Sequence, residues 1–188
     1  MRTLRSFLPA LAVSVSVCVS VWPAAWSAPE VAADAGEPVA LPEFTTADPR
    51  HWFNSGPLRV ADLRGRVLLV DVWTFGCWNC YRSFPWVKAL EANLADLPFQ
   101  MIGVHSPEFA HERDPSRVAG KIAEFGLRHP VMLDNDLAYW RALGNRYWPA
   151  FYLVDKSGRI RHRHVGETHA GDARADLIER QIRVLLAE

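Results

Sequence analysis

Two cysteines separated by two residues are the side chains in this sequence whose types and spacing point most directly to chemistry. They are Cys77 and Cys80 in the stretch "GCWNC", and the chain has three cysteines in all. A pair at this spacing can be a redox couple, half of a zinc site or a structural disulfide. A bridge over two intervening residues closes almost no loop, so it would stabilise the fold little. The pair is therefore better explained by chemistry than by stability.

The segments on either side of the pair predict where the two thiols lie. The apolar run "VLLVDVW" (67–73) predicts a strand buried on both faces, and residues 78–94 predict a helix with one apolar face. Cys77 would then lie at the helix N-terminus, where unpaired N–H groups and the helix dipole stabilise a thiolate. This predicts Cys77 as the attacking thiol and Cys80, one turn further on, as a covered resolving thiol.

Asp71 interrupts the apolar run before the cysteines, where an isolated carboxylate is costly. It could lie at a strand end and pair with a surface group. Alternatively it could be buried beneath the cysteine pair and accept a proton from Cys80, with its pKa raised toward neutrality. The residues alone leave both interpretations open.

Trp78, Trp148 and Pro149 are candidates for contact with a substrate, whereas Pro85 bears on the shape of the predicted helix. Pro149 precedes the apolar run "AFYLVD", and from the residues alone a trans Trp148–Pro149 bond is the ordinary expectation. Trp78 lies between the cysteines, where the chain must be reachable, and is predicted to be exposed. Pro85 lies inside the predicted helix and should kink it.

The rest of the chain predicts an α/β fold. The order of elements implies parallel strands with a closing antiparallel hairpin, giving a mixed sheet with helices on both faces. The expected elements are a loose hairpin at 53–66, strands at 99–105, 129–134, 150–155 and 159–166, and helices at 115–125, 135–144 and 172–188.

The N-terminal segment predicts export. Arg2 and Arg5 precede an apolar stretch and small residues at a cleavage spacing, which is typical of a signal peptide over residues 1–27. An uncleaved membrane anchor and a lipoprotein acylated at Cys18 are the alternatives. Residues 28–43 are predicted as a linker and residues 44–188 as one domain. Beyond residue 27 there are 19 basic and 21 acidic residues, which gives no electrostatic case for binding nucleic acid.

Several stretches together resemble a known family. "VDVWTFGCWNC" followed by "FP", with Pro85 five residues after the second cysteine, is similar to the thioredoxin superfamily active site. "WPAFYLVDKSGRI" resembles the proline loop and final hairpin of that fold. "FGCWNC", "GVHSPEF", "NDLAYW", "YWPAFYLVD" and "GE" resemble the TlpA-like redoxin branch, especially the thioredoxin domain that DipZ-like proteins join to CcdA-type transporters.

The resemblance implies a thioredoxin-like fold and a set of roles. It agrees with the roles given to Cys77, Cys80 and Asp71, and it implies that Pro149 is cis and that the Trp148 backbone pairs with a substrate peptide. Residues 105–125 would be a redoxin-type insertion. Glu108 would either tune the pKa of the sulfurs or be a solvated loop carboxylate, and Glu167 would be structural.

Two positions depart from the relatives. Cytochrome-maturation relatives often carry a glutamate where this chain has Ser83, and the pair between the cysteines is Trp78–Asn79. The redox direction therefore cannot be carried over from them.

The leading hypothesis is an exported thiol–disulfide oxidoreductase that needs no cofactor beyond its cysteine pair. It would reduce protein disulfides with electrons from a membrane donor of the CcdA or DsbD type. One alternative is a copper or zinc module, in which the cysteines join two of the seven histidines. His162 and His164 alternate with arginines on a predicted strand, and the remaining histidines show no ligand spacing. The other alternative is a redox-inert binding protein, against which the intact cysteine pair argues.

Overall fold

The computed structural model describes residues 39–188. The predicted signal peptide, its two alternatives and residues 28–38 of the predicted linker lie outside this range. None of the helices within it is long and apolar enough to cross a membrane.

A seven-stranded sheet forms the centre of the described part, in the order β1-β7-β6-β3-β4-β5-β2. Strands β3, β4 and β5 are parallel, whereas β6 pairs antiparallel with both β3 and β7. The predicted mixed sheet is therefore confirmed. The strands are β1 (Val39–Ala40), β2 (Trp52–Phe53), β3 (Val67–Trp73), β4 (Phe99–His105), β5 (Val131–Leu133), β6 (Ala150–Val154) and β7 (Arg159–Val165).

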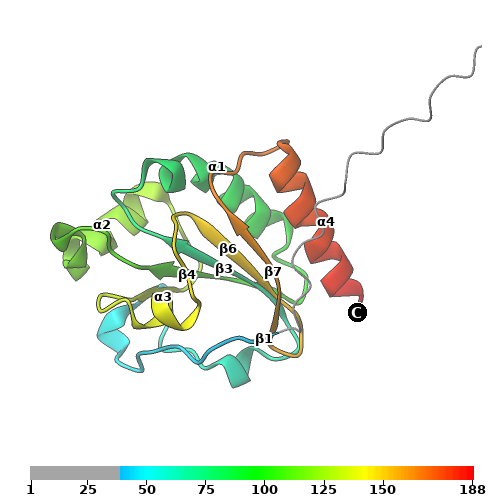
Figure 1. The fold of residues 1–188 in the computed structure, drawn as a ribbon, viewed down its shortest axis with the longest axis horizontal. Coiled ribbons are helices and arrows are strands. Elements are labelled where there is room, and N and C mark those ends of the chain that lie inside the picture. Colours follow the sequence, from blue (N-terminus) through cyan, green and yellow to red (C-terminus); the bar gives the residue numbers. More distant parts are fainter. Residues whose placement is uncertain (1–38) are drawn as a thin grey trace, which may run out of the picture. The chain divides into compact units, whose positions relative to one another are not determined.

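Helices cover both faces of this sheet, as predicted (Figure 1). Side chains alternate between the faces along β3, so Val67 and Leu69 pack with α1 and α4, while Leu68 and Val70 pack on the side of α3. The helices are α1 (Trp78–Asn93), α2 (Pro115–Phe125), α3 (Ala138–Ala142) and α4 (Ala173–Ala187), and three short 3-10 helices are η1 (Pro49–His51), η2 (Val60–Leu63) and η3 (Ala110–Arg113).

Local sequence explains where α2 begins and ends. The Asp114 carboxylate accepts the N–H of Ser116 at 2.9 Å, and Pro115 occupies the first turn, where its missing N–H costs nothing. Gly126 ends the helix in the left-handed region with a φ of 69°. The expected insertion at 105–125 thus folds as η3 followed by α2.

Two expectations about the N-terminal part differ from the structure. The loose hairpin at 53–66 is wrong: Trp52 and Phe53 pair with β5, and Val60 and Leu63, three residues apart, bury themselves on one turn of 3-10 helix. The folded part also begins before Phe44, because Val39 and Ala40 pair with β7 and Leu41 is buried. Two-residue strands carry too little periodicity to be recognised in a sequence.

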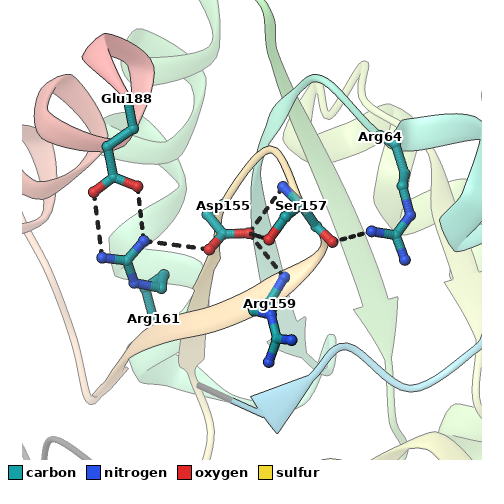
Figure 2. Close-up of polar contacts among 6 residues, drawn as sticks. All are labelled: Arg64, Asp155, Ser157, Arg159, Arg161 and Glu188. Atoms are coloured by element: carbon teal, nitrogen blue, oxygen red, sulfur yellow. Dashed lines mark hydrogen bonds and ion pairs between the residues drawn. The ribbon is translucent and has the colours of Figure 1, made fainter. Parts of the chain in front are cut away.

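A polar cluster fixes the β6–β7 turn to helix α4 (Figure 2). The Asp155 carboxylate accepts the N–H groups of Ser157 and Arg159 at 2.9 and 3.0 Å and forms an ion pair with Arg161 at 3.2 Å. Arg161 also pairs with Glu188 at 2.7 Å, just beyond the end of α4. The closing hairpin and the last helix are therefore held together at one end of the sheet.

Candidate active site

Cys77 and Cys80 form a disulfide at the N-terminus of α1, with their Cα atoms 5.3 Å apart. Cys77 is the N-cap, and its Sγ accepts the backbone N–H of Cys80 at 3.1 Å. Cys77 is partly exposed, whereas Cys80 is completely buried. This asymmetry gives the two sulfurs the exposures expected for an attacking and a resolving thiol.

Asp71 is buried within β3, where it lies between Gly103 of β4 and Phe151 of β6 in the register of the sheet. Its side chain points to the same face as Leu69 and Trp73, which is the face that α1 covers. Its Oδ1 has no hydrogen-bond partner, and burial raises its pKa to about 8. The sequence left open whether Asp71 pairs with a surface group at a strand end or is buried. In the structure its carboxylate is buried.

The Trp148–Pro149 peptide bond is cis. The isomer implied by the family resemblance is therefore confirmed, and the expectation from the residues alone is wrong. The Trp148 indole donates to the Ser106 carbonyl at 3.0 Å and packs on Trp140 with ring centroids 4.2 Å apart. Trp148 and Cys77 both pack against the core cluster that contains Cys80, so the proline loop and the cysteine pair border the same part of the core.

A groove of about 280 Å³ opens beside Cys77. Trp78, 66% exposed as predicted, stacks on Tyr81 at its edge with ring centroids 5.4 Å apart. The groove is lined by Phe75, Gly76, Cys77, Trp78, Tyr81, Lys121, Glu124 and Phe125. An apolar side chain could lie there next to the sulfur of Cys77.

The buried carboxylate of the loop after β4 belongs to Glu112, which the sequence did not single out. Glu108 is exposed, and its backbone N–H donates to Glu112 at 2.7 Å, as does the N–H of Phe109 at 3.0 Å. The available signal was position: Glu112 is the third residue of η3, from which a glutamate can reach back to the N-terminal N–H groups.

His105 is a second buried group near the cysteines that the sequence pattern does not mark as functional. It ends β4, and its Nε2 accepts the N–H of Phe75 at 3.4 Å. Burial lowers the pKa of His105 to about 4, so its imidazole is neutral at pH 7. It packs between Trp73 and Phe75, directly behind the loop that carries the cysteines.

Ser83 ties α1 to the segment after β7. Its hydroxyl donates to the Asn79 carbonyl at 2.8 Å and accepts the N–H of Thr168 at 3.0 Å. Arg82 and Glu167 form a salt bridge at 3.0 Å beside this contact. These contacts agree with the structural role expected for Glu167.

No group of three or more His, Cys, Asp or Glu side chains within residues 39–188 is arranged to hold a metal ion. His164, one of the histidines weighed as a ligand, is hydrogen-bonded to Gln181 at 2.7 Å.

Comparisons with known proteins agree with this fold and this cysteine pair. Protein DipZ of Mycobacterium tuberculosis is 42% identical over 119 residues, which cover 62% of this chain and only 17% of DipZ. The thiol-disulfide oxidoreductase YkuV of Bacillus subtilis is 28% identical over 148 residues, covering 79% of this chain and 95% of YkuV. A thiol-disulfide isomerase from Corynebacterium glutamicum matches with a TM-score of 0.64 and 26% identity, covering 79% of this chain and 97% of that one.

The fold and the cysteine pair define a thioredoxin-fold protein with the site of a thiol–disulfide oxidoreductase. The Redoxin family model matches residues 34–178. The chain therefore belongs to the redoxin family.

Proposed function

We propose that this chain is an exported thiol–disulfide oxidoreductase that reduces disulfides in other proteins. The observation that carries the proposal is the pairing of a partly exposed Cys77 with a fully buried Cys80 at one helix N-terminus. A thiolate at Cys77 would be stabilised by the dipole of α1 and by the N–H of Cys80.

The reaction would proceed in two exchange steps. The Cys77 thiolate attacks one sulfur of a substrate disulfide, and the other substrate sulfur leaves with the bonding electron pair and takes up a proton. Cys80 then loses its proton and attacks the Cys77 sulfur, which releases the second substrate thiolate. Two electrons pass from the dithiol to the substrate, and the Cys77–Cys80 disulfide is left.

Asp71 would accept the Cys80 proton in the second step. A base works best when its pKa lies near the working pH, and burial raises the pKa of Asp71 to about 8. At pH 7 about one tenth of Asp71 is ionised when its pKa is about 8, and this ionised form is the one that accepts the Cys80 proton.

The substrate peptide would lie across the cysteine pair and the proline loop. We assign its backbone to pair with Trp148 beside cis-Pro149, and an apolar side chain to the groove bordered by Trp78. Clusters of exposed aromatic side chains with one polar edge are typical of surfaces that bind protein partners.

The dithiol would be restored by two electrons and two protons from a membrane donor of the CcdA or DsbD type. The similarity to DipZ and the signal sequence expected over residues 1–27 support this placement outside the cytoplasm. Cleavage after Ser27 would release the chain, and an uncleaved segment would anchor it.

Trapping tests the mechanism. Cys80→Ser should accumulate mixed disulfides with protein substrates through Cys77, visible as reducible adducts on a non-reducing gel. The matched Cys77→Ser variant should accumulate none. Adducts formed equally by both variants, or by neither, would contradict the assignment.

The midpoint potential of the couple tests the direction. A value below about −250 mV is expected of a reductase, because thioredoxin lies near −270 mV. A value above about −180 mV would instead indicate an oxidant or isomerase.

A further inference from the structure

The Glu112 carboxylate is buried directly beneath the active-site loop, which we define as residues 74–77. It has no exposed surface, its Oε2 accepts two backbone N–H groups, and its Oε1 has no partner in ordinary hydrogen-bond geometry. An unpartnered oxygen with no access to water is costly. The position of that oxygen therefore calls for an explanation.

Gly76, the residue before Cys77, lies directly against this oxygen. A Cβ added at Gly76 would overlap Oε1 of Glu112 and lie 3.2 Å from its Cδ. Only a glycine leaves room for the carboxylate to approach the loop this closely. The Cys77 N–H donates to the Thr74 carbonyl at 3.2 Å, so the loop turns tightly over the carboxylate.

The groups around Glu112 keep it charged. Burial alone would raise its pKa, but the Phe109 N–H, the nearby Thr74 hydroxyl and the Glu108 N–H outweigh burial and lower the pKa of Glu112 below its usual value. Within residues 39–188 it forms no salt bridge.

The other titratable and charged groups near the loop do not cancel this charge. His105 of β4 is neutral at pH 7, because burial lowers its pKa to about 4. The guanidinium of Arg117 of α2 lies 5.5 Å from the centre of the Phe75 ring. It donates to the His111 carbonyl in a solvent-exposed hydrogen bond. Lys121 is paired with Glu124 at 2.7 Å.

We propose that Glu112 is a positioning residue of the Cys77–Cys80 couple, whose buried negative charge beneath the active-site loop disfavours the Cys77 thiolate and makes the couple more strongly reducing. The inference rests on the proposed function and names a device that sets its potential. A like charge held nearby raises the free energy of an anion, and the disulfide, which carries no charge, escapes this cost. Glu112 thus opposes the helix dipole, which favours the thiolate.

Glu112→Gln tests the proposal, because it keeps the size and the acceptor oxygen and removes only the charge. The pKa of Cys77, followed in the reduced protein by thiolate absorbance at 240 nm, should fall by about one pH unit. Above the pKa of Cys77 the midpoint potential should rise by the corresponding tenfold change in equilibrium constant, which is about 30 mV. Well below that pKa the two proteins should have equal potentials, because the thiol is uncharged.

The pH profile separates the electrostatic role from a structural one. A loop that was merely loosened would shift the potential by the same amount at every pH, and that result would overturn the proposal. Glu108→Gln is the matched variant, since it removes an exposed charge from the same loop. It should move the Cys77 pKa much less, and an equal or larger shift would assign the effect to Glu108 instead.

A measurement on the wild-type chain covers the case in which Glu112→Gln fails to fold. Coupling between two sites is reciprocal, so the ¹³C carboxyl resonance of Glu112 should follow the titration of Cys77 in the reduced protein and not in the oxidised one. A Glu112 chemical shift that stays constant through the titration of Cys77 would refute the inference. If Cys80→Ser traps no adducts but Glu112→Gln still lowers the pKa of Cys77, only the proposed function is refuted.

Discussion

Asp71 on β3 and Glu112 in η3 are both fully buried carboxylates, and they differ in the donors around them. Each carboxylate has one oxygen without a hydrogen-bond partner, but burial raises the pKa of Asp71 to about 8, so Asp71 holds a proton at neutral pH. Glu112 accepts two backbone N–H groups, and its pKa is lowered despite its burial. Burial alone therefore does not decide the charge of a carboxylate; the available N–H groups do.

The difference assigns the two groups to different tasks. A group that exchanges its proton near neutral pH can take part in a proton transfer, whereas a group that stays ionised can only supply a constant field. Asp71, which can exchange its proton, lies on the face of β3 that α1 covers. Glu112, which stays ionised, lies against Gly76, the residue before Cys77.

The difference between the two carboxylates should affect the pH dependence of stability more than any other property. Folded Asp71 keeps its proton up to about pH 8, while in the unfolded chain it ionises near the ordinary aspartate pKa of 3.8. The oxidised protein should therefore lose up to about 4 kcal/mol of unfolding free energy between pH 5 and pH 8 through this group. Asp71→Asn should flatten that slope in urea unfolding experiments, and the exposed Asp96→Asn should not. A slope unchanged by Asp71→Asn would show that Asp71 is ionised in the fold.

The second prediction concerns the resolving step. Asp71→Asn should slow the attack of Cys80 on the mixed disulfide by about 100-fold at pH 7, since general bases contribute at least that much. Stopped-flow measurement of substrate release after rapid mixing would give this rate. The first attack by Cys77 serves as the internal control and should change only a few-fold, and an equal slowing of both steps would remove Asp71 from the proton transfer.

The third prediction breaks the fit between Glu112 and the active-site loop. Gly76→Ala would place a methyl group on Glu112 Oε1 and should destabilise the protein by about 1–3 kcal/mol, the usual cost of overpacking. Combining it with Glu112→Ala should recover part of that loss in a double-mutant cycle. If the losses of unfolding free energy from the two substitutions were strictly additive, Gly76 and Glu112 would not be in steric contact.

Glu112 should change the pH dependence of stability less than Asp71 does, and in the opposite direction. Because the pKa of Glu112 is lowered in the fold, the ionised carboxylate stabilises the protein at neutral pH, and this stabilisation is lost as the pH falls below the ordinary glutamate pKa of 4.5. The stability difference between the wild-type chain and Glu112→Gln should therefore narrow in acid. A difference that widens in acid would mean that Glu112 is protonated in the folded protein.

The sequence is informative for the elements around Asp71 and poor for those around Glu112. The run 67–73 is long and apolar, so it predicts both a central strand and an anomalous aspartate within it. The spacing of Cys77 and Cys80 likewise predicts their helical turn, which the structure confirms.

Glu112 lies in the polar stretch "HERD", where a buried carboxylate cannot be told from solvated ones. Its burial depends on the fold of η3 and on the missing side chain of Gly76, two segments that are 36 residues apart in the numbering. A pattern that spans one element predicts that element, whereas a contact between distant loops leaves no periodicity.

The polar cluster of Figure 2 also determines how the described part would carry a mechanical load. Val39 and Ala40 pair with Ile160 and Arg159, and Glu188 is held by Arg161, so both ends of residues 39–188 are attached to the same short stretch of β7. The register of β3 against β6 puts that stretch at the opposite end of the sheet from Cys77. A pull between Val39 and Glu188 would therefore load the contacts of both ends with β7, which lie at the far end of the sheet from the cysteine pair.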